Sequence, residues 1–231
     1  MTSETITDID ALTAALSGLV GTDAIALAAQ SELVTDQLYP DEREHIGRAI
    51  SKRQAEFGTA RVLARRALAA QGFPEQSLVP RANRAPTWPA QAVGSISHSH
   101  GFCAVVVGRA GDLAGIGLDL ETSREVSPQL QAAICTPAEL AWLQQLRQSA
   151  GEARWLDTLV FSAKEAFYKC QYALTQTYLG FQDVELHLDA SAQTFRVAQL
   201  SDRAPQPSRL LQIRGRWCRL PGLLITLATL R

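Results

Sequence analysis

A short apolar segment that carries two carboxylates, GIGLDLE at residues 115–121, places the strongest constraint on how this chain can fold. Its length, its apolar side chains and its glycines predict a buried β-strand. Because side chains at positions i and i+2 of a strand lie on the same face, Asp119 and Glu121 should point in one direction. Leu118 and Leu120 should then face the opposite side.

A second segment, FSAKEAFYK at residues 161–169, follows about forty residues later and predicts an α-helix. Glu165 and Lys169 are four positions apart and should share a helix face, with Lys164 beside them. The apolar stripe of this helix consists of Leu156, Leu159, Val160, Ala163, Phe167 and Cys170. Magnesium takes oxygen ligands, usually a few carboxylates together with the phosphates of a substrate. The two segments therefore have the side chains needed for a hard cation and a phosphate group.

Each segment also has an ordinary structural interpretation. An Asp-x-Glu pair at the end of a strand is usually a solvated strand terminus. Glu165 and Lys169 would make a common helix-surface ion pair, worth about 0.2–0.5 kcal/mol. Neither segment identifies a function by itself, so the evidence lies in their combination, their order and their spacing.

Together, a strand with the pattern GxDxE and a later helix with FSxKEAxxK resemble the 4′-phosphopantetheinyl transferases of the Sfp type. The resemblance is to the bacterial branch that activates the synthetases of enterobactin and other siderophores. It implies an α/β (α+β) fold of two similar lobes related by a pseudo-twofold, each a small, mainly antiparallel sheet packed with helices. Residues 1–112 would form the lobe that binds the nucleotide of coenzyme A. Residues 113–231 would form the lobe with the metal and catalytic motifs, and the active site would lie between the two.

The implied reaction is attack by a serine of an apo acyl or peptidyl carrier protein on the β-phosphorus of coenzyme A, which releases 3′,5′-ADP. By the same resemblance, Asp119, Glu121 and Glu165 would hold Mg²⁺, or Mn²⁺ in its place, against the pyrophosphate. Glu165 is also the best candidate for the general base. Lys164 and Lys169 would be catalytic and would neutralise the pyrophosphate, with Lys169 nearer the leaving group. Spacing alone leaves open which carboxylate accepts the proton.

Basic residues of the first half imply a site for the nucleotide end of coenzyme A. The segment KRQAEFGTARVLARRAL is similar to a family helix whose arginines approach that end, which assigns Arg53 and Arg61. Arg81 and Arg84 lie in a proline-rich loop where the family has basic residues near the 3′-phosphate, and arginine binds phosphate bidentately. His98 closes GSISH, which resembles the segment of a phosphate-contacting histidine. The ordinary alternatives are solvated helix arginines, a charged loop and a structural histidine.

Two capped helices can be placed from the sequence. One should run from Asp41 to Gly72, with Glu44 three positions after Asp41 to complete a capping box. The other should begin at Thr136, with Glu139 as its third helical residue. The first of these helices would carry Arg53 and Arg61.

The composition limits the functional class. A net charge of −1 over 231 residues argues against nucleic acid or an anionic membrane as partner, and so against the alternative of a metal-dependent nuclease. No apolar run approaches the roughly 18 residues of a membrane span, and no signal peptide is evident. The four cysteines form no C-x-x-C pair, which indicates reduced thiols. We expect a soluble, cytoplasmic, monomeric enzyme; the remaining alternative is an inactive carrier-protein-binding homologue.

Overall fold

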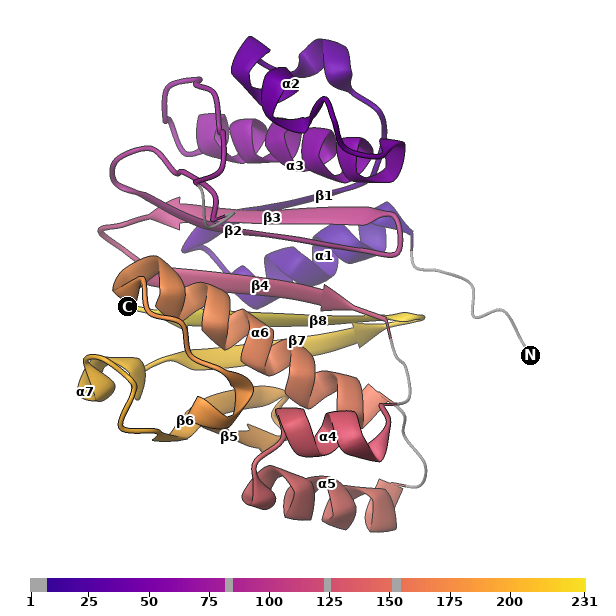
Figure 1. Ribbon diagram of the computed structural model, residues 1–231, viewed down its shortest axis with the longest axis vertical. Coiled ribbons are helices and arrows are strands. Elements are labelled where there is room, and N and C mark those ends of the chain that lie inside the picture. Colours follow the sequence, from indigo (N-terminus) through magenta and orange to yellow (C-terminus); the bar gives the residue numbers. More distant parts are fainter. Residues whose placement is uncertain (1–7, 82–84, 123–125, 151–154) are drawn as a thin grey trace.

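The computed structural model describes residues 8–81, 85–122, 126–150 and 155–231, and combines helices with two antiparallel sheets (Figure 1). The helices are α1 (Ile9–Val20), α2 (Pro40–Ile46), α3 (Ser51–Ala70), α4 (Pro128–Ile134), α5 (Pro137–Ala150), α6 (Trp155–Thr175) and α7 (Pro207–Leu210). The strands are β1 (Ala24–Gln30), β2 (Ala92–Ser99), β3 (Phe102–Arg109), β4 (Gly115–Glu121), β5 (Val184–Asp189), β6 (Thr194–Leu200), β7 (Arg214–Leu220) and β8 (Leu223–Leu230). Short 3₁₀ turns cover Thr35–Gln37 and Phe181–Asp183. None of the helices in these ranges has the length and apolar character required to cross a membrane.

The same arrangement of three strands and a long helix occurs twice in the chain. The first sheet has the order β1-β3-β2 and the second the order β4-β8-β7-β6-β5, and neighbouring strands are antiparallel in both. Helix α3 follows β1 and packs on the first sheet, just as α6 follows β4 and packs on β4 and β8. The order β1-β3-β2 thus corresponds to β4-β8-β7. The predicted fold of two similar lobes, each a mainly antiparallel sheet packed with helices, is confirmed.

The hydrophobic core crosses the link between the two sheets. The predicted division, with residues 1–112 in one lobe and 113–231 in the other, falls between β3 and β4. One buried cluster nevertheless joins Leu12 of α1 to Leu118 of β4 and Ile225 of β8. The two lobes share this part of their core. The boundary at residue 112 therefore separates the two sheets in the sequence, and the division into two domains there remains a prediction.

The two sheets meet edge to edge at β2 and β4 (Figure 1), which lie side by side but remain members of separate sheets. Serine hydroxyls act there as acceptors for backbone amides. The amide of Leu118 donates to Ser95 Oγ at 2.9 Å, and the amide of Leu120 donates to Ser97 Oγ at 3.1 Å. The pairing advances in the same direction on both strands, so β2 and β4 run parallel. We call this contact the serine seam.

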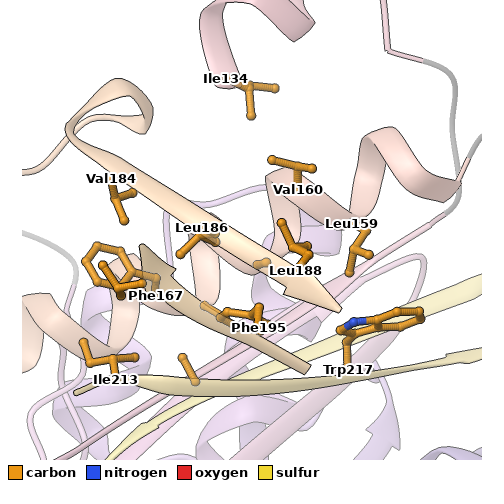
Figure 2. Packing of buried hydrophobic residues seen from close by; sticks show 14 of the residues in the cluster. Ile134, Leu159, Val160, Phe167, Val184, Leu186, Leu188, Phe195, Ile213 and Trp217 are labelled. Carbon is orange, nitrogen blue, oxygen red and sulfur yellow. The ribbon is translucent and has the colours of Figure 1, made fainter. Parts of the chain in front are cut away.

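Helix α6 lies close against β4 because the strand has a glycine at the crossing. A Cβ atom at Gly117 would lie 1.9 Å from the carbonyl oxygen of Ala166, far inside any allowed contact. On its other side, α6 buries the predicted apolar stripe. Val160 and Phe167 of this stripe pack in one cluster with Leu186 of β5 (Figure 2). The sequence-based prediction of the helix and of its buried face is confirmed.

The predicted single helix from Asp41 to Gly72 is wrong, because the chain forms two helices, α2 and α3, with a break between them. The break begins at Gly47, a residue type with low helix propensity. The side chain of Gln54 donates to the carbonyl oxygens of Gly47 at 3.3 Å and Ala49 at 2.8 Å. These bonds satisfy carbonyls that a continuous helix would have paired.

The predicted cap of that helix is also wrong. The residue before α2 is Tyr39, and its backbone amide donates to the carboxylate of Glu42 at 3.0 Å. Asp41 already lies within the helix, and its carboxylate accepts from the hydroxyl of Ser77 at 2.7 Å. Glu42 therefore caps the helix in place of the predicted Glu44. The helix begins at Pro40, two residues earlier than it would with Asp41 as its cap.

Candidate active site

Asp119 lies on the face of β4 that α6 covers, with 5 % of its surface exposed. Its Oδ1 atom accepts from Nζ of Lys169 at 2.7 Å and from the hydroxyl of Ser97 at 3.1 Å. Its Oδ2 atom accepts from the hydroxyl of Ser162 at 2.8 Å. The neighbouring leucines of β4 pack on the opposite side with α1. The predicted orientation of this strand is therefore confirmed.

Lys169 connects the carboxylate to the surface of the site. Besides Asp119, its ammonium donates to the carbonyl oxygen of Leu118 at 2.9 Å and to Ser97 Oγ at 3.3 Å. The side chain keeps 27 % of its surface exposed. An ammonium held by three oxygens at the edge of a cavity can neutralise negative charge on a bound ligand without first leaving the protein surface.

Glu165 lies one turn before Lys169 on α6 and is half-buried. Burial raises the pKa of this carboxyl, the nearby charge of Asp119 raises it further, and the charge of Lys169 opposes both effects. The two carboxylates and the lysine are thus electrostatically coupled. A carboxyl whose pKa lies above its ordinary range is better suited to accept a proton near neutral pH.

Glu121 ends β4 and, by the alternation of the strand, shares the face of Asp119. Carboxylate oxygens are the donors that Mg²⁺ prefers, so Asp119, Glu121 and Glu165 fit this ion by their chemistry. In the described parts of the chain, however, no three Asp, Glu, His or Cys side chains are gathered in a group that could hold a metal ion. The ammonium of Lys169 is the cation bound at Asp119. The geometry is that of an ion pair.

Arg53, Glu56 and His98 form a polar cluster where α3 meets β2. Nη1 of Arg53 lies 2.9 Å from Nε2 of His98 and 3.4 Å from Oε2 of Glu56. His98 Nδ1 lies 3.5 Å from the same carboxylate oxygen. Burial lowers the pKa of His98; Glu56 opposes this effect and Arg53 adds to it. A neutral imidazole that accepts from Arg53 through Nε2 agrees with this direction.

Arg61 is buried on the same helix, and its Nε donates to the carbonyl oxygen of Leu78 at 2.7 Å. Its guanidinium lies over the ring of Phe57 at 4.1 Å from the centroid, and burial lowers its pKa to about 10. Arg81 follows at the start of the proline-rich loop, where its amide donates to Ala85 O at 2.9 Å. Arg84, the other arginine predicted in this loop, lies outside the described residues.

A cavity of about 540 Å³ opens between α3, β2 and the C-terminal half of α6. Five of the predicted residues line it: Arg53, Arg61, Arg81, His98 and Lys169. Aromatic rings supply part of the apolar wall, from Phe57, Trp88, Tyr168 and Tyr172. Small-molecule sites commonly have volumes of about 300–1,000 Å³. The structure thus brings four of the predicted nucleotide-binding residues and Lys169 to one space of ligand size.

Lys164 is placed apart from this group. It lies on the opposite side of α6 from Asp119, and its ammonium forms a buried ion pair with Glu139 at 2.7 Å. The cavity lining does not include it. The sequence pattern grouped Lys164 with Glu165 and Lys169, but successive residues of a helix point about 100° apart.

Two serines at the site were not assigned from the sequence. Ser97 donates to Asp119 from the first lobe, and Ser162 donates to it from α6. Helical spacing could have identified Ser162, because Ser162, Glu165 and Lys169 lie at i, i+3 and i+7. Ser97 carries no comparable signal, since its contact depends on how the two sheets meet.

Two family models match the chain: the 4′-phosphopantetheinyl transferase N-terminal domain at residues 41–108, and the 4′-phosphopantetheinyl transferase superfamily at residues 115–219. The 4′-phosphopantetheinyl transferase Svp of Streptomyces mobaraensis is 39% identical over 193 residues, which cover 82% of this chain and 77% of the relative. The transferase PptT of Mycobacterium tuberculosis is 33% identical over 192 residues, which cover 81% and 83%. Among solved structures, holo-[acyl-carrier-protein] synthase of Neisseria meningitidis aligns with a TM-score of 0.38 and 20% identity, over 52% of this chain and 98% of that one. The chain therefore belongs to the 4′-phosphopantetheinyl transferase superfamily and is a transferase of that kind.

Proposed function

We propose that the protein transfers 4′-phosphopantetheine from coenzyme A to a serine of an apo acyl or peptidyl carrier protein in a Mg²⁺-dependent reaction. One observation supports this most: a single cavity is lined both by basic residues of the first lobe and by Lys169 of the second. The residues of the first lobe are Arg53, Arg61, Arg81 and His98. Coenzyme A carries a 3′-phosphate and a pyrophosphate, so it needs several cations spread along one cleft. The arginines and Lys169 line the same cleft, and Lys169 also pairs with the buried carboxylate of Asp119.

In this proposal the basic residues of the first lobe hold the nucleotide. Arg53 and Arg81 bind phosphate oxygens, while the buried Arg61 supports the floor of the cavity through its contact with Leu78. His98, as a neutral acceptor for Arg53, orients that guanidinium. Arg84 is assigned to the 3′-phosphate on the family resemblance alone.

Carboxylates and lysine of the second lobe perform the chemistry. Asp119, Glu121 and Glu165 are the residues that would hold Mg²⁺, or Mn²⁺ in its place; the ion, when bound, supplies Lewis-acid charge neutralisation of the pyrophosphate. The serine oxygen forms a bond to the β-phosphorus, and the bond from that phosphorus to the bridging oxygen breaks, so 3′,5′-ADP leaves. Glu165, directly or through water, takes the serine proton. Lys169 neutralises the charge that develops on the departing phosphate.

Intact-mass spectrometry of carrier proteins tests the proposal. The protein is incubated with an apo acyl carrier protein or an apo peptidyl carrier protein, coenzyme A and Mg²⁺, and the acceptor should gain the mass of one phosphopantetheine. An acceptor whose serine is replaced by alanine is the control and should gain none. Chelation should abolish the transfer, and Mg²⁺ or Mn²⁺ should restore it. Undiminished transfer after thorough chelation would exclude the metal, and no transfer to any acceptor would favour an inactive carrier-binding protein.

A further inference from the structure

Lys164 is enclosed where four segments of the second lobe meet. Only 1 % of its surface is exposed. Its ammonium donates to Oε2 of Glu139 at 2.7 Å, to the carbonyl oxygen of Ile134 at 2.8 Å and to that of Phe181 at 2.6 Å. A lysine ammonium has three N–H donors, and three acceptors surround this one. Lys169 also contacts three oxygens but keeps 27 % of its side-chain surface exposed, whereas the enclosed ammonium of Lys164 offers no surface to a phosphate oxygen.

Glu139 is equally enclosed, with 1 % of its surface exposed. Its Oε2 also accepts from the amide of Thr136 at 2.7 Å, which confirms the predicted capping box at the start of α5. Its Oε1 accepts from the amide of Leu186 in β5 at 2.8 Å. The pair Lys164–Glu139 therefore ties together the end of α4, the start of α5, the middle of α6, the Phe181 turn and β5.

The Phe181 turn stands beside Glu165. A hollow of about 120 Å³ on this side of α6 is lined by Glu165, Lys164 and Tyr178, and by Leu179 to Phe181, which lead into the turn. The bond from Lys164 to Phe181 O fixes the start of this turn. Lys164 thus controls a wall of the space next to the proposed general base without touching the reacting atoms.

We propose that Lys164 is a positioning residue, which holds the segment from Tyr178 to Phe181 and the α4–α5 junction against α6 and thereby fixes Glu165 for proton transfer. This inference rests on the proposed function of Glu165. It removes Lys164 from the set of phosphate ligands, although the family pattern places it directly beside the catalytic glutamate. Its partner Glu139 acts through the same network.

The test compares Lys164→Met, Glu139→Gln and the double variant. Each single change leaves one charge buried without its partner, which is strongly destabilising, whereas the double change removes both charges. The amide in place of Glu139 keeps an oxygen for Leu186 N–H. We expect the melting temperature of Lys164→Met to fall by about 10 °C, and that of the double variant to recover most of this loss. Arg203→Met is the matched control, because Arg203 is an exposed arginine that pairs with Asp183, the last residue of the same turn.

Steady-state transfer, measured well below each melting temperature, separates positioning from ligand binding. For Lys164→Met we expect kcat to fall about 10- to 100-fold with KM for coenzyme A unchanged, because a misplaced catalytic group lowers the rate of the chemical step. The double variant should regain most of kcat, and Arg203→Met should match the unaltered protein.

Three outcomes would overturn the inference. A raised KM for coenzyme A in Lys164→Met would make Lys164 a phosphate ligand. A double variant that recovers its stability but stays as slow as Lys164→Met would give the ammonium a direct role in catalysis. Unchanged kcat and KM in folded Lys164→Met would reduce the pair to a structural one. Failure of the proposed function is a separate result, since it appears as no transfer by the unaltered protein.

Discussion

The ammonium of Lys169 lies 2.7 Å from Oδ1 of Asp119, so one ion pair joins the helix of one motif to the strand of the other. The ammonium is the cation bound at this carboxylate. A divalent ion that binds Asp119 must therefore compete with the positive charge of Lys169. In the proposed Mg²⁺ site, the metal affinity would therefore depend on Lys169, a residue that is not itself a ligand.

Lys169→Ala should strengthen metal binding and slow transfer at the same time. Removal of a positive charge a few ångströms from the carboxylates should raise their affinity for Mn²⁺ by about tenfold or more. Electron paramagnetic resonance of free Mn²⁺ measures this affinity, and Lys52→Ala, on the exposed start of α3, is the control. Equal or weaker Mn²⁺ binding in Lys169→Ala would show that the two cations do not compete.

Glu165→Gln should separate proton transfer from substrate binding. The amide preserves the shape of the side chain but not its charge or basicity, so kcat should fall by the roughly 10²- to 10⁴-fold typical of a general base. Calorimetry should show that coenzyme A still binds, and the melting temperature should stay near that of the unaltered protein. Near-normal single-turnover transfer would move the base to Asp119, Glu121 or a metal-bound hydroxide.

Substrate pairs can locate the 3′-phosphate among the basic residues. Arg53→Ala or Arg81→Ala should raise KM for coenzyme A more than KM for 3′-dephospho-coenzyme A, if the replaced residue holds that phosphate. The loss of one charged hydrogen bond corresponds to roughly 1.5–3 kcal/mol, or about ten- to a hundredfold in KM. Equal effects on both substrates would assign the arginine to another part of the ligand.

Gly117→Ala should destabilise the protein more than any ordinary glycine change. The new methyl group would lie 1.9 Å from the carbonyl oxygen of Ala166, so α6 would have to move away from β4. Overpacking of this kind costs about 1–3 kcal/mol and occasionally more. Gly111→Ala, where a Cβ atom meets nothing within 4 Å, is the matched control in urea unfolding. A similar free energy of unfolding for both variants would contradict the close packing.

His98 should make the protein less stable under mildly acidic conditions. Its folded-state pKa lies below the ordinary value of 6.5, so the unfolded chain binds the proton more readily. The contribution of His98 to stability is then complete above about pH 6.5 and is lost as the pH falls below that value. Titration by NMR should show a lowered pKa that rises in Arg53→Ala, since the charge of Arg53 helps to lower it. A fall in the pKa of His98 in that variant would be the contrary result.

Local patterns were enough to predict the parts of the site that lie within one element. The alternation of β4 predicted that Asp119 faces away from Leu118 and Leu120, and the helical repeat predicted the buried stripe of α6. Lys164 was predicted to act with Glu165 and Lys169; its ion pair with Glu139, a buried partner on another helix, has no signal in the local spacing. The break at Gly47 was not predicted. The carbonyl oxygen that it leaves unpaired is bonded by the side chain of Gln54, and this contact depends on side-chain geometry that the sequence pattern does not show. Sequence periodicity predicts which face of an element a residue occupies, but it does not predict which charged residue of another element lies against that face.

The serine seam gives the site something that one continuous sheet would not. In a continuous sheet, the amide of Leu120 would donate to a backbone carbonyl, which can only accept. The hydroxyl of Ser97 accepts from that amide at 3.1 Å and still has its own proton to donate to Asp119. The interruption between the two sheets is thus the source of a donor, and the boundary that separates the lobes also polarises the carboxylate on which they converge.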